Sequence, residues 1–284
     1  MTKTILVTGA TGTIGKALIK SLQNKEANFV AGVRDTILGK SKLPNVNLVE
    51  FDFANSSTFE NATKDVEIVF LLGPPLVLNL VELMTPFIDF LKKKNINRVV
   101  YVSALRLDKI KEMPFHSILT KKLIDEGFEY TILNLSFFAQ NFKSYEWENI
   151  TERGITFMPA GNGKVGFVDV QDVGEATATI LTEPNHSFKS YEFTGPELLS
   201  YGDAAVILSD VIGKTISYPN PTPQEFTSVL KSAGAPEFIA PYMISVYSLI
   251  ANDHVSILSN DLETITGKKP NTLKQVLKRD FNSN

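Results

Sequence analysis

Cysteine is absent from the 284-residue sequence. Disulfide bonds, thiolate metal sites and a cysteine nucleophile are therefore excluded. The three histidines, His116, His186 and His254, are far apart in the sequence and form no metal-binding motif. We predict that the protein has no structural zinc site and binds no metal.

Basic residues are in the minority, with 28 Lys and Arg against 31 Asp and Glu and a formal net charge of −3. No basic stripe could neutralise a phosphate backbone, so nucleic acid and anionic membrane surfaces are not expected partners. The longest apolar run, residues 68–78, spans 11 residues and is interrupted by a Gly-Pro-Pro sequence. A membrane span needs roughly 18 apolar residues. Because the first residues also lack the apolar region of a signal peptide, we expect a soluble, cytoplasmic protein.

Short apolar runs alternate with helical patterns through the first half of the chain, which is typical of βαβ units. Several runs are apolar at every position, as expected for strands that are buried on both faces of a parallel sheet. We predict an α/β Rossmann fold with a doubly wound parallel sheet. The expected strands are residues 4–8, 28–33, 46–51, 67–72, 98–103 and 130–134, and the expected helices between them are residues 14–23, 80–93 and 118–125.

The alternation weakens after about residue 150, and helical patterns then dominate. We expect residues 1–154 to form the nucleotide-binding domain, with residues 171–184 packing back on it, and residues 155–284 to form a smaller, mostly helical substrate domain. The cleft between them is the expected ligand site. The strands and helices predicted in this half are residues 155–158, 165–170 and 191–194, and residues 201–211, 223–232, 237–249 and 271–278.

A glycine loop follows the first predicted strand and opens the first predicted helix. Gly9 permits a tight turn, Gly12 lets the backbone approach a pyrophosphate, and Gly15 lets the helix pack closely on the strand. The helix N-terminus then attracts the anion. An ordinary strand-turn-helix connection is the alternative. The other residues of the expected cofactor-binding loop are Thr11, Thr13 and Ile14.

The end of the second strand carries Arg34 rather than the acid that usually binds an NAD ribose. A guanidinium matches a 2′-phosphate, so NADP(H) is favoured over NAD(H). In the alternative, the cofactor is NAD(H), Asp35 is the acid that binds its ribose, and Arg34 is a solvated surface residue. Asp52 and Phe53, after the third strand, are expected beside the adenine, although Asp52 also suits a helix start.

These features together resemble the NmrA-like group of atypical short-chain dehydrogenases/reductases. The resemblance covers nearly the whole chain, and its tail is similar to bacterial NADPH quinone oxidoreductases and ergot alkaloid reductases of this group. It implies a Rossmann domain with a small C-terminal substrate domain, and NADP(H) bound through the glycine loop, Arg34, the Gly73-Pro74 turn and Ser103. Only some members are enzymes, since the founding regulator senses redox state. The motifs are residues 7–15, 33–35, 52–53, 72–75, 102–104, 130–133, 161–164, 168–173, 193–197 and 267–273, with Phe138 and Asn141.

Ordinary short-chain dehydrogenases use a Tyr-x-x-x-Lys pair, but His116 and Thr120 occupy those two positions here. Asn134 also replaces the arginine that is usual in the family. Conventional ketone reduction is therefore not expected. His116 is the candidate proton donor, because an ordinary imidazole titrates near neutrality, although a packing role at the helix start is the alternative. Ser103 is a candidate to hydrogen-bond the nicotinamide or the acceptor, and Lys121 to contact the cofactor.

Aromatic residues are dense after the sixth predicted strand. Phe137, Phe138, Asn141 and Tyr145 are the candidates to contact a flat acceptor, although aromatics at this spacing also suit a core. A quinone or enone delocalises incoming electrons, so holding it near the nicotinamide in a dry cleft supplies most of the catalysis.

We therefore predict an NADPH-dependent oxidoreductase that transfers hydride to a quinone or another conjugated small molecule. The alternatives are an NADP-binding redox sensor without turnover and an ene or imine reductase of secondary metabolism. A homodimer or a protein partner is left open.

Overall fold

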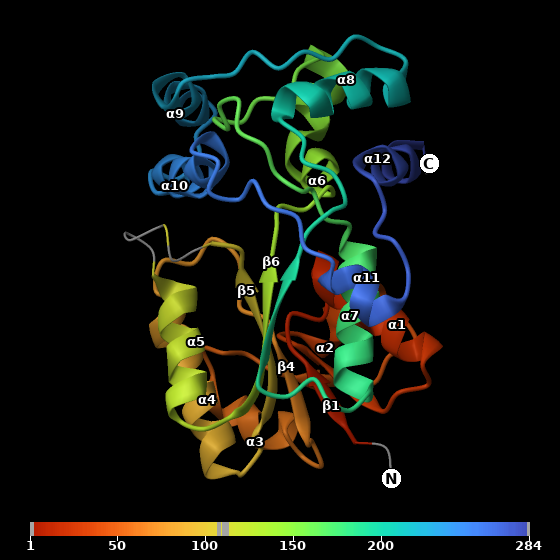
Figure 1. Ribbon diagram of the computed structural model, residues 1–284. Helices are drawn as coiled ribbons and strands as arrows, with labels where there is room; N and C mark the ends of the chain where they lie inside the picture. The colour runs from red at the N-terminus through yellow and green to blue at the C-terminus, as the bar shows by residue number, and fades with distance from the viewer. Residues whose placement is uncertain (1–2, 107–108, 110–113, 283–284) are drawn as a thin grey trace.

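The computed structural model describes residues 3–106, 109 and 114–282. Within them, seven parallel strands form one sheet in the order β3-β2-β1-β4-β5-β6-β7 (Figure 1). The predicted doubly wound parallel sheet is confirmed. The strands are β1 Ile5–Val7, β2 Phe29–Val33, β3 Leu48–Glu50, β4 Ile68–Leu71, β5 Arg98–Ala104, β6 Glu129–Leu135 and β7 Lys189–Phe193.

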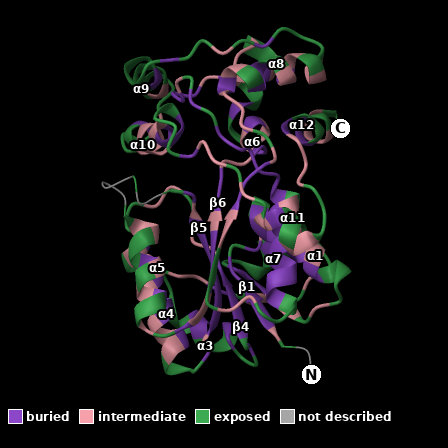
Figure 2. Ribbon diagram, viewed as in Figure 1, coloured by how far each residue is buried: buried purple, intermediate pink, exposed green. Residues whose placement is uncertain are grey.

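Helices cover both faces of this sheet, which explains why its central strands are apolar at every position. All four residues of β4 are buried, and so are the three of β1. Figure 2 shows the buried residues concentrated on the strands and on the helix sides that face them. One face packs against α3 Phe59–Ala62, α4 Leu80–Lys93 and α5 Phe115–Asp125, and the other against α1 Thr13–Asn24, α2 Thr36–Lys42, α7 Val170–Thr182 and α11 Asp261–Thr266.

The approach of α7 to α1 depends on a glycine. A Cβ added at Gly174 would lie 2.6 Å from the carbonyl carbon of Ala17, so the two helices meet at backbone contact. Because α1 opens at the glycine loop, α7 supports the helix whose N-terminus is the expected phosphate site.

A second hydrophobic cluster lies beyond the carboxyl ends of the strands, among helices (Figure 1). The domain boundary at residues 154 and 155 stays a prediction, and β7, which lies after it, belongs to the sheet. None of the helices in the described residues is long and apolar enough to cross a membrane. The helices of this part are α6 Asn141–Glu148, continued by the π-helical turn η3 Asn149–Arg153, α8 Tyr201–Ile212, α9 Pro223–Ser232, α10 Ile239–Ala251 and α12 Leu273–Asn282.

Two predicted strands, residues 155–158 and 165–170, are wrong. They make only isolated bridges, from Ile155 to Ser217, from Val165 to Leu199 and from Val168 to Phe138, because loops rather than extended strands lie beside them. The β-branched residues near Val170 favour a strand, although α7 starts there. Asp169 caps this helix by accepting a hydrogen bond from the Gln171 N–H. Helix α6 escaped prediction because it buries only Phe142 and Glu146 and so lacks an apolar stripe.

Glu146 anchors α6 in the helical part. Its Oε2 accepts hydrogen bonds from the Thr156 hydroxyl at 2.7 Å and from the Phe157 N–H at 2.5 Å, and the residue is 1% exposed. Burial raises the pKa of the Glu146 carboxyl to about 7, and the two hydrogen bonds oppose the rise only in part. The folded protein therefore holds a proton here that the unfolded chain releases at lower pH.

Replacing Glu146 by glutamine is expected to stabilise the protein above pH 7. The unfolded carboxyl ionises with its ordinary pKa of 4.5 and the folded one near 7, so the wild type loses stability as the pH rises between these values. The full loss is on the order of 3 kcal/mol. Melting temperatures of both proteins at pH 5 and pH 8 measure the difference, which should grow with pH. Glu148→Gln, at an exposed position of the same helix, is the matched control and should show no such growth.

Candidate functional site

The candidate site lies at the carboxyl edge of the sheet, where the strand order reverses between β1 and β4. Open α/β sheets bind ligands at such a switch point. Thr8 ties the two strand ends together here. The Leu72 N–H donates to Thr8 Oγ1 at 2.8 Å, and the Thr8 hydroxyl lies 3.1 Å from the carbonyl oxygens of Phe70 and Leu72.

The glycine loop begins with Gly9, which adopts the left-handed conformation at φ 63°. Its carbonyl oxygen accepts a hydrogen bond from the Gly12 N–H at 3.0 Å. A Cβ at Gly15 would lie 2.3 Å from this oxygen and 2.7 Å from the Cα of Ala10, so only glycine fits. The tight turn and the close packing of α1 both follow the prediction from spacing.

The N-terminus of α1 fits an anion. Gly12 is the N-cap residue and gives no side-chain cap, and the first turn holds no acidic residue that would compete. The N–H groups of this turn are therefore available to a ligand. A Cβ added at Gly12 would meet only the Gly9 oxygen, at 3.3 Å, so the space in front of it is open. Ile14 packs its side chain in the core and can offer only its N–H, while Thr11 and Thr13 lie on the rim of the loop.

Arg34 and Asp35 follow β2 and have different environments. Asp35 Oδ1 caps α2, accepting hydrogen bonds from the Ile37 N–H at 2.8 Å and the Leu38 N–H at 2.9 Å. Arg34 is exposed at the strand end, and its side chain has no hydrogen bond or ion pair among the described residues. Because the Asp35 carboxylate caps α2, Arg34 remains the candidate to contact the 2′-phosphate of the cofactor.

The loops after β3 and β4 supply the remaining predicted cofactor residues. Asp52 accepts a hydrogen bond from the Ala54 N–H at 2.9 Å, and Phe53 packs edge-on against Phe51 with ring centroids 4.8 Å apart. A Cβ at Gly73 would lie 2.6 Å from Met84 Sδ, so this turn with Pro74 packs closely on α4. All these loops meet at the carboxyl edge, but contact of these residues with a cofactor stays a prediction.

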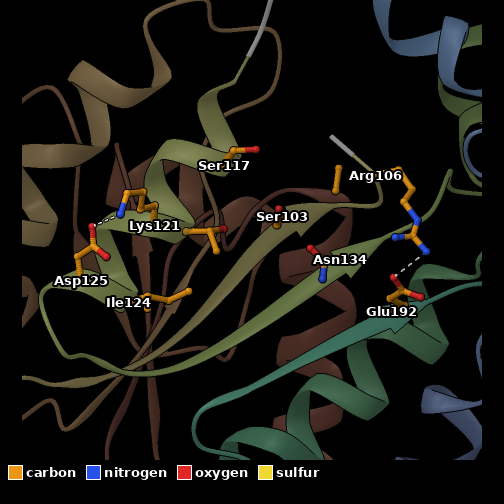
Figure 3. A pocket seen from close by; sticks show the side chains of 10 residues that line it. Ser103, Arg106, Ser117, Lys121, Ile124, Asp125, Asn134 and Glu192 are labelled. Atoms are coloured by element: carbon orange, nitrogen blue, oxygen red, sulfur yellow. Dashed lines mark hydrogen bonds and ion pairs between the residues drawn. The ribbon is translucent and has the colours of Figure 1, made fainter. Parts of the chain in front are cut away.

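Ser103, near the end of β5, is 7% exposed and pairs in register with Asn134 of β6. Both residues line a pocket of about 490 Å³ between α5 and the sheet (Figure 3). Lys121 also lines it, with its ammonium 2.6 Å from Asp125 Oδ2. Ala104 belongs to the motif of residues 102–104, and Thr120 stands at the place of the usual lysine. The lining residues that lie in no motif are Arg106, Ser117, Ile124, Asp125 and Glu192.

His116 contacts the buried Tyr101 rather than this pocket. The Tyr101 hydroxyl and His116 Nδ1 are 2.6 Å apart. Burial lowers the pKa of His116 to about 4, so the imidazole is neutral at pH 7, and the expectation that it titrates near neutrality is wrong. Burial also raises the pKa of Tyr101. A role of His116 in proton transfer stays a prediction, but a pKa near neutrality no longer supports it.

The predicted acceptor-contacting residues do not form one surface. Phe137 packs against Tyr247 with ring centroids 5.4 Å apart, whereas Phe138 packs against the cluster that contains α1 and α7. Tyr145 is 58% exposed, and Asn141 is the first residue of α6. Their contact with an acceptor stays untested.

A buried polar network joins the sheet to the helical part. Asp169 is fully buried, and its carboxylate accepts hydrogen bonds from Arg279 Nη1 at 2.7 Å and Nη2 at 3.0 Å. Gln140 and Asn271 donate to it at 2.9 and 3.0 Å. Burial opposes ionisation of Asp169, but these bonds together with the Gln171 N–H hold its pKa below the ordinary value. Asp169 lies within the motif of residues 168–173, whereas Arg279 lies in no motif.

Nearly the whole chain matches one family. A model of the NmrA-like family matches residues 1–280. The chain belongs to the NmrA-like family. The resemblance read from its motifs is thereby confirmed.

Three relatives illustrate what the family contains. Agroclavine dehydrogenase of Claviceps fusiformis is 29% identical over 281 residues, which cover 94% of this chain and 93% of that protein. The NAD(P)H azoreductase of Xenophilus azovorans is 28% identical over 278 residues, 96% of each chain. The crystal structure of an NADPH-dependent quinone oxidoreductase from Escherichia coli, complexed with NADPH, has a TM-score of 0.88 at 25% identity and covers 98% of this chain and 100% of that one. All three names describe redox enzymes, and two state a nicotinamide cofactor, the classes that the sequence predicts.

Proposed function

We propose that this protein is an NADPH-dependent oxidoreductase that transfers hydride to a quinone or another conjugated small molecule. The uncapped N-terminus of α1, open in front of Gly12, is the observation that carries the proposal. The exposed Arg34 supports the phosphorylated cofactor, and the family relatives support a redox reaction.

The chain's own groups have distinct tasks in this proposal. The free N–H groups that follow Gly12, in the first turn of α1, bind the pyrophosphate, and Arg34 binds the 2′-phosphate. Bound NADPH supplies the hydride from its nicotinamide. Ser103 offers a hydroxyl at the carboxyl end of β5, where the acceptor would be oriented. Because His116 pairs with Tyr101 and does not line the pocket, and because burial lowers its pKa to about 4, water supplies the proton of the reduced acceptor in this proposal.

Purified protein should oxidise NADPH in the presence of menadione, followed as the loss of absorbance at the nicotinamide band under anaerobic conditions. One hydroquinone should form for each NADPH consumed. Binding of NADPH without turnover on a panel of quinones, enones, imines and azo compounds would contradict the proposal and favour a redox-sensing protein. Turnover only with enones or imines would identify an ene or imine reductase instead.

Replacing Arg34 by alanine should weaken NADPH binding about 10- to 100-fold and change NADH binding less than about twofold, since the guanidinium contacts only the 2′-phosphate. Calorimetric titration with both nucleotides measures the two affinities. Lys231→Ala, which removes an exposed cation from α9, is the control. Equal losses for both nucleotides would show that Arg34 does not read the phosphate.

A further inference from the structure

We propose that the pocket between α5 and the strands β5, β6 and β7 binds an uncharged, hydroxyl-bearing ring of the electron acceptor. This inference rests on the proposed function and names the acceptor class. It concerns the pocket of Figure 3, which lies beside the expected nicotinamide site.

The floor of the pocket is a row of residues at one level of the sheet. Ser103 of β5 is in register with Asn134 of β6, and Asn134 is in register with Glu192 of β7. All three line the pocket. The row starts on β5, which lies beside β4, and runs outward to the edge strand β7. The loop that carries Gly73 follows β4. A ligand in this row therefore extends from the hydride-transfer region to the sheet edge.

The wall is one face of α5. Ser117, Thr120, Lys121 and Ile124 recur at the three- and four-residue spacing that places side chains on the same side of a helix. Three of the lining side chains, those of Ser103, Ala104 and Ser117, are small, and the pocket measures about 490 Å³. Small-molecule sites typically measure about 300–1,000 Å³, so one substituted ring fits this space.

The charges at the two ends of the pocket are already paired. Lys121 lies 2.6 Å from Asp125, and Arg106 lies 3.6 Å from Glu192. Figure 3 shows these pairs on opposite sides of the pocket. The lining thus carries two positive and two negative groups, which favours neither an anion nor a cation.

Neutral hydrogen-bonding groups occupy the middle. They are the hydroxyls of Ser103, Ser117 and Thr120 and the amide of Asn134. Asn134 Nδ2 donates to Ser190 Oγ at 2.8 Å, and in Figure 3 the amide oxygen lies on the side of Ser103. A carboxamide oxygen accepts, and hydroxyls both donate and accept. A hydroxyl on the ligand, which also does both, satisfies this set.

Three acceptors test the proposal: 1,4-naphthoquinone, its 2-phenyl derivative and its 2-(4-hydroxyphenyl) derivative. The wild type should show a KM for the hydroxyphenyl compound that is five- to tenfold lower than for the phenyl compound. Asn134→Arg places a long cationic side chain over the row and should reduce this preference to about one. Ser117→Ala should reduce it about threefold, because it removes one hydroxyl from an exposed helix position and does not threaten folding.

Ser228→Ala on α9 is the matched control, since it makes the same change on an exposed helix far along the chain. The preference should survive in this variant. Turnover of all three compounds by the wild type without a preference would overturn the pocket assignment alone. Absence of turnover with these three compounds and with the whole acceptor panel named above would overturn the proposed function and this inference with it.

Discussion

Replacing Gly12 by alanine is expected to weaken NADPH binding about 100-fold, or about 2.7 kcal/mol, while the protein stays folded. The backbone at Gly12 has φ −77° and ψ 176°, a conformation that alanine adopts readily. The added methyl would meet only the Gly9 oxygen, at 3.3 Å, within the protein. It would project into the space that a pyrophosphate must enter, so the loss should fall on the ligand.

Calorimetry with NADPH and a thermal melt of the free protein separate the two effects. Gly202→Ala, in the first turn of α8, is the control, because its Cβ would meet only Ser200 Oγ, at 3.5 Å. Gly15→Ala should differ from both and lose stability, because its Cβ would collide with backbone. Unchanged NADPH affinity of the Gly12 variant would show that the pyrophosphate does not bind at this loop.

Replacing Arg279 by alanine is expected to destabilise the protein by about 3 kcal/mol. This value is at the lower end of the losses seen when a buried ion pair is broken, because the Arg279 side chain is 32% exposed. The change leaves the fully buried Asp169 carboxylate without its bidentate partner. Helix α12 would also lose its polar attachment to the start of α7. The melting temperature should fall by about 6–12 °C.

A second substitution isolates the cause. Asp169→Asn added to Arg279→Ala should recover part of the lost stability, because the unpaired buried charge is then removed. Arg153→Ala, which removes an exposed arginine bonded to Asn149, should change the melting temperature by no more than about 2 °C. An equal loss in the Arg279 and Arg153 variants would contradict the role of the ion pair.

The parallel sheet and the glycine loop could be predicted because their signals are local. A strand buried on both faces is apolar at every position, as in β4, and each such run is complete within a few residues. The loop is equally local, since Gly9, Gly12 and Gly15 meet one another within a single turn and the start of α1. Helix α6 could not be predicted for the opposite reason. Its position depends on the contacts of Glu146 and Phe142 with residues outside the helix.

The properties of the site depend on residues far apart in the chain. Folding packs His116 against Tyr101, and the resulting desolvation lowers the pKa of the imidazole to about 4, which the sequence of a helix start alone does not indicate. Asp169 finds Arg279 across 110 positions, and Ser103, Asn134 and Glu192 become neighbours only when three strands align. Local sequence patterns therefore determine the fold class and the glycine loop. Desolvation and cross-strand alignment, which exist only after packing, decided the ionisation state of the histidine and the position of the pocket.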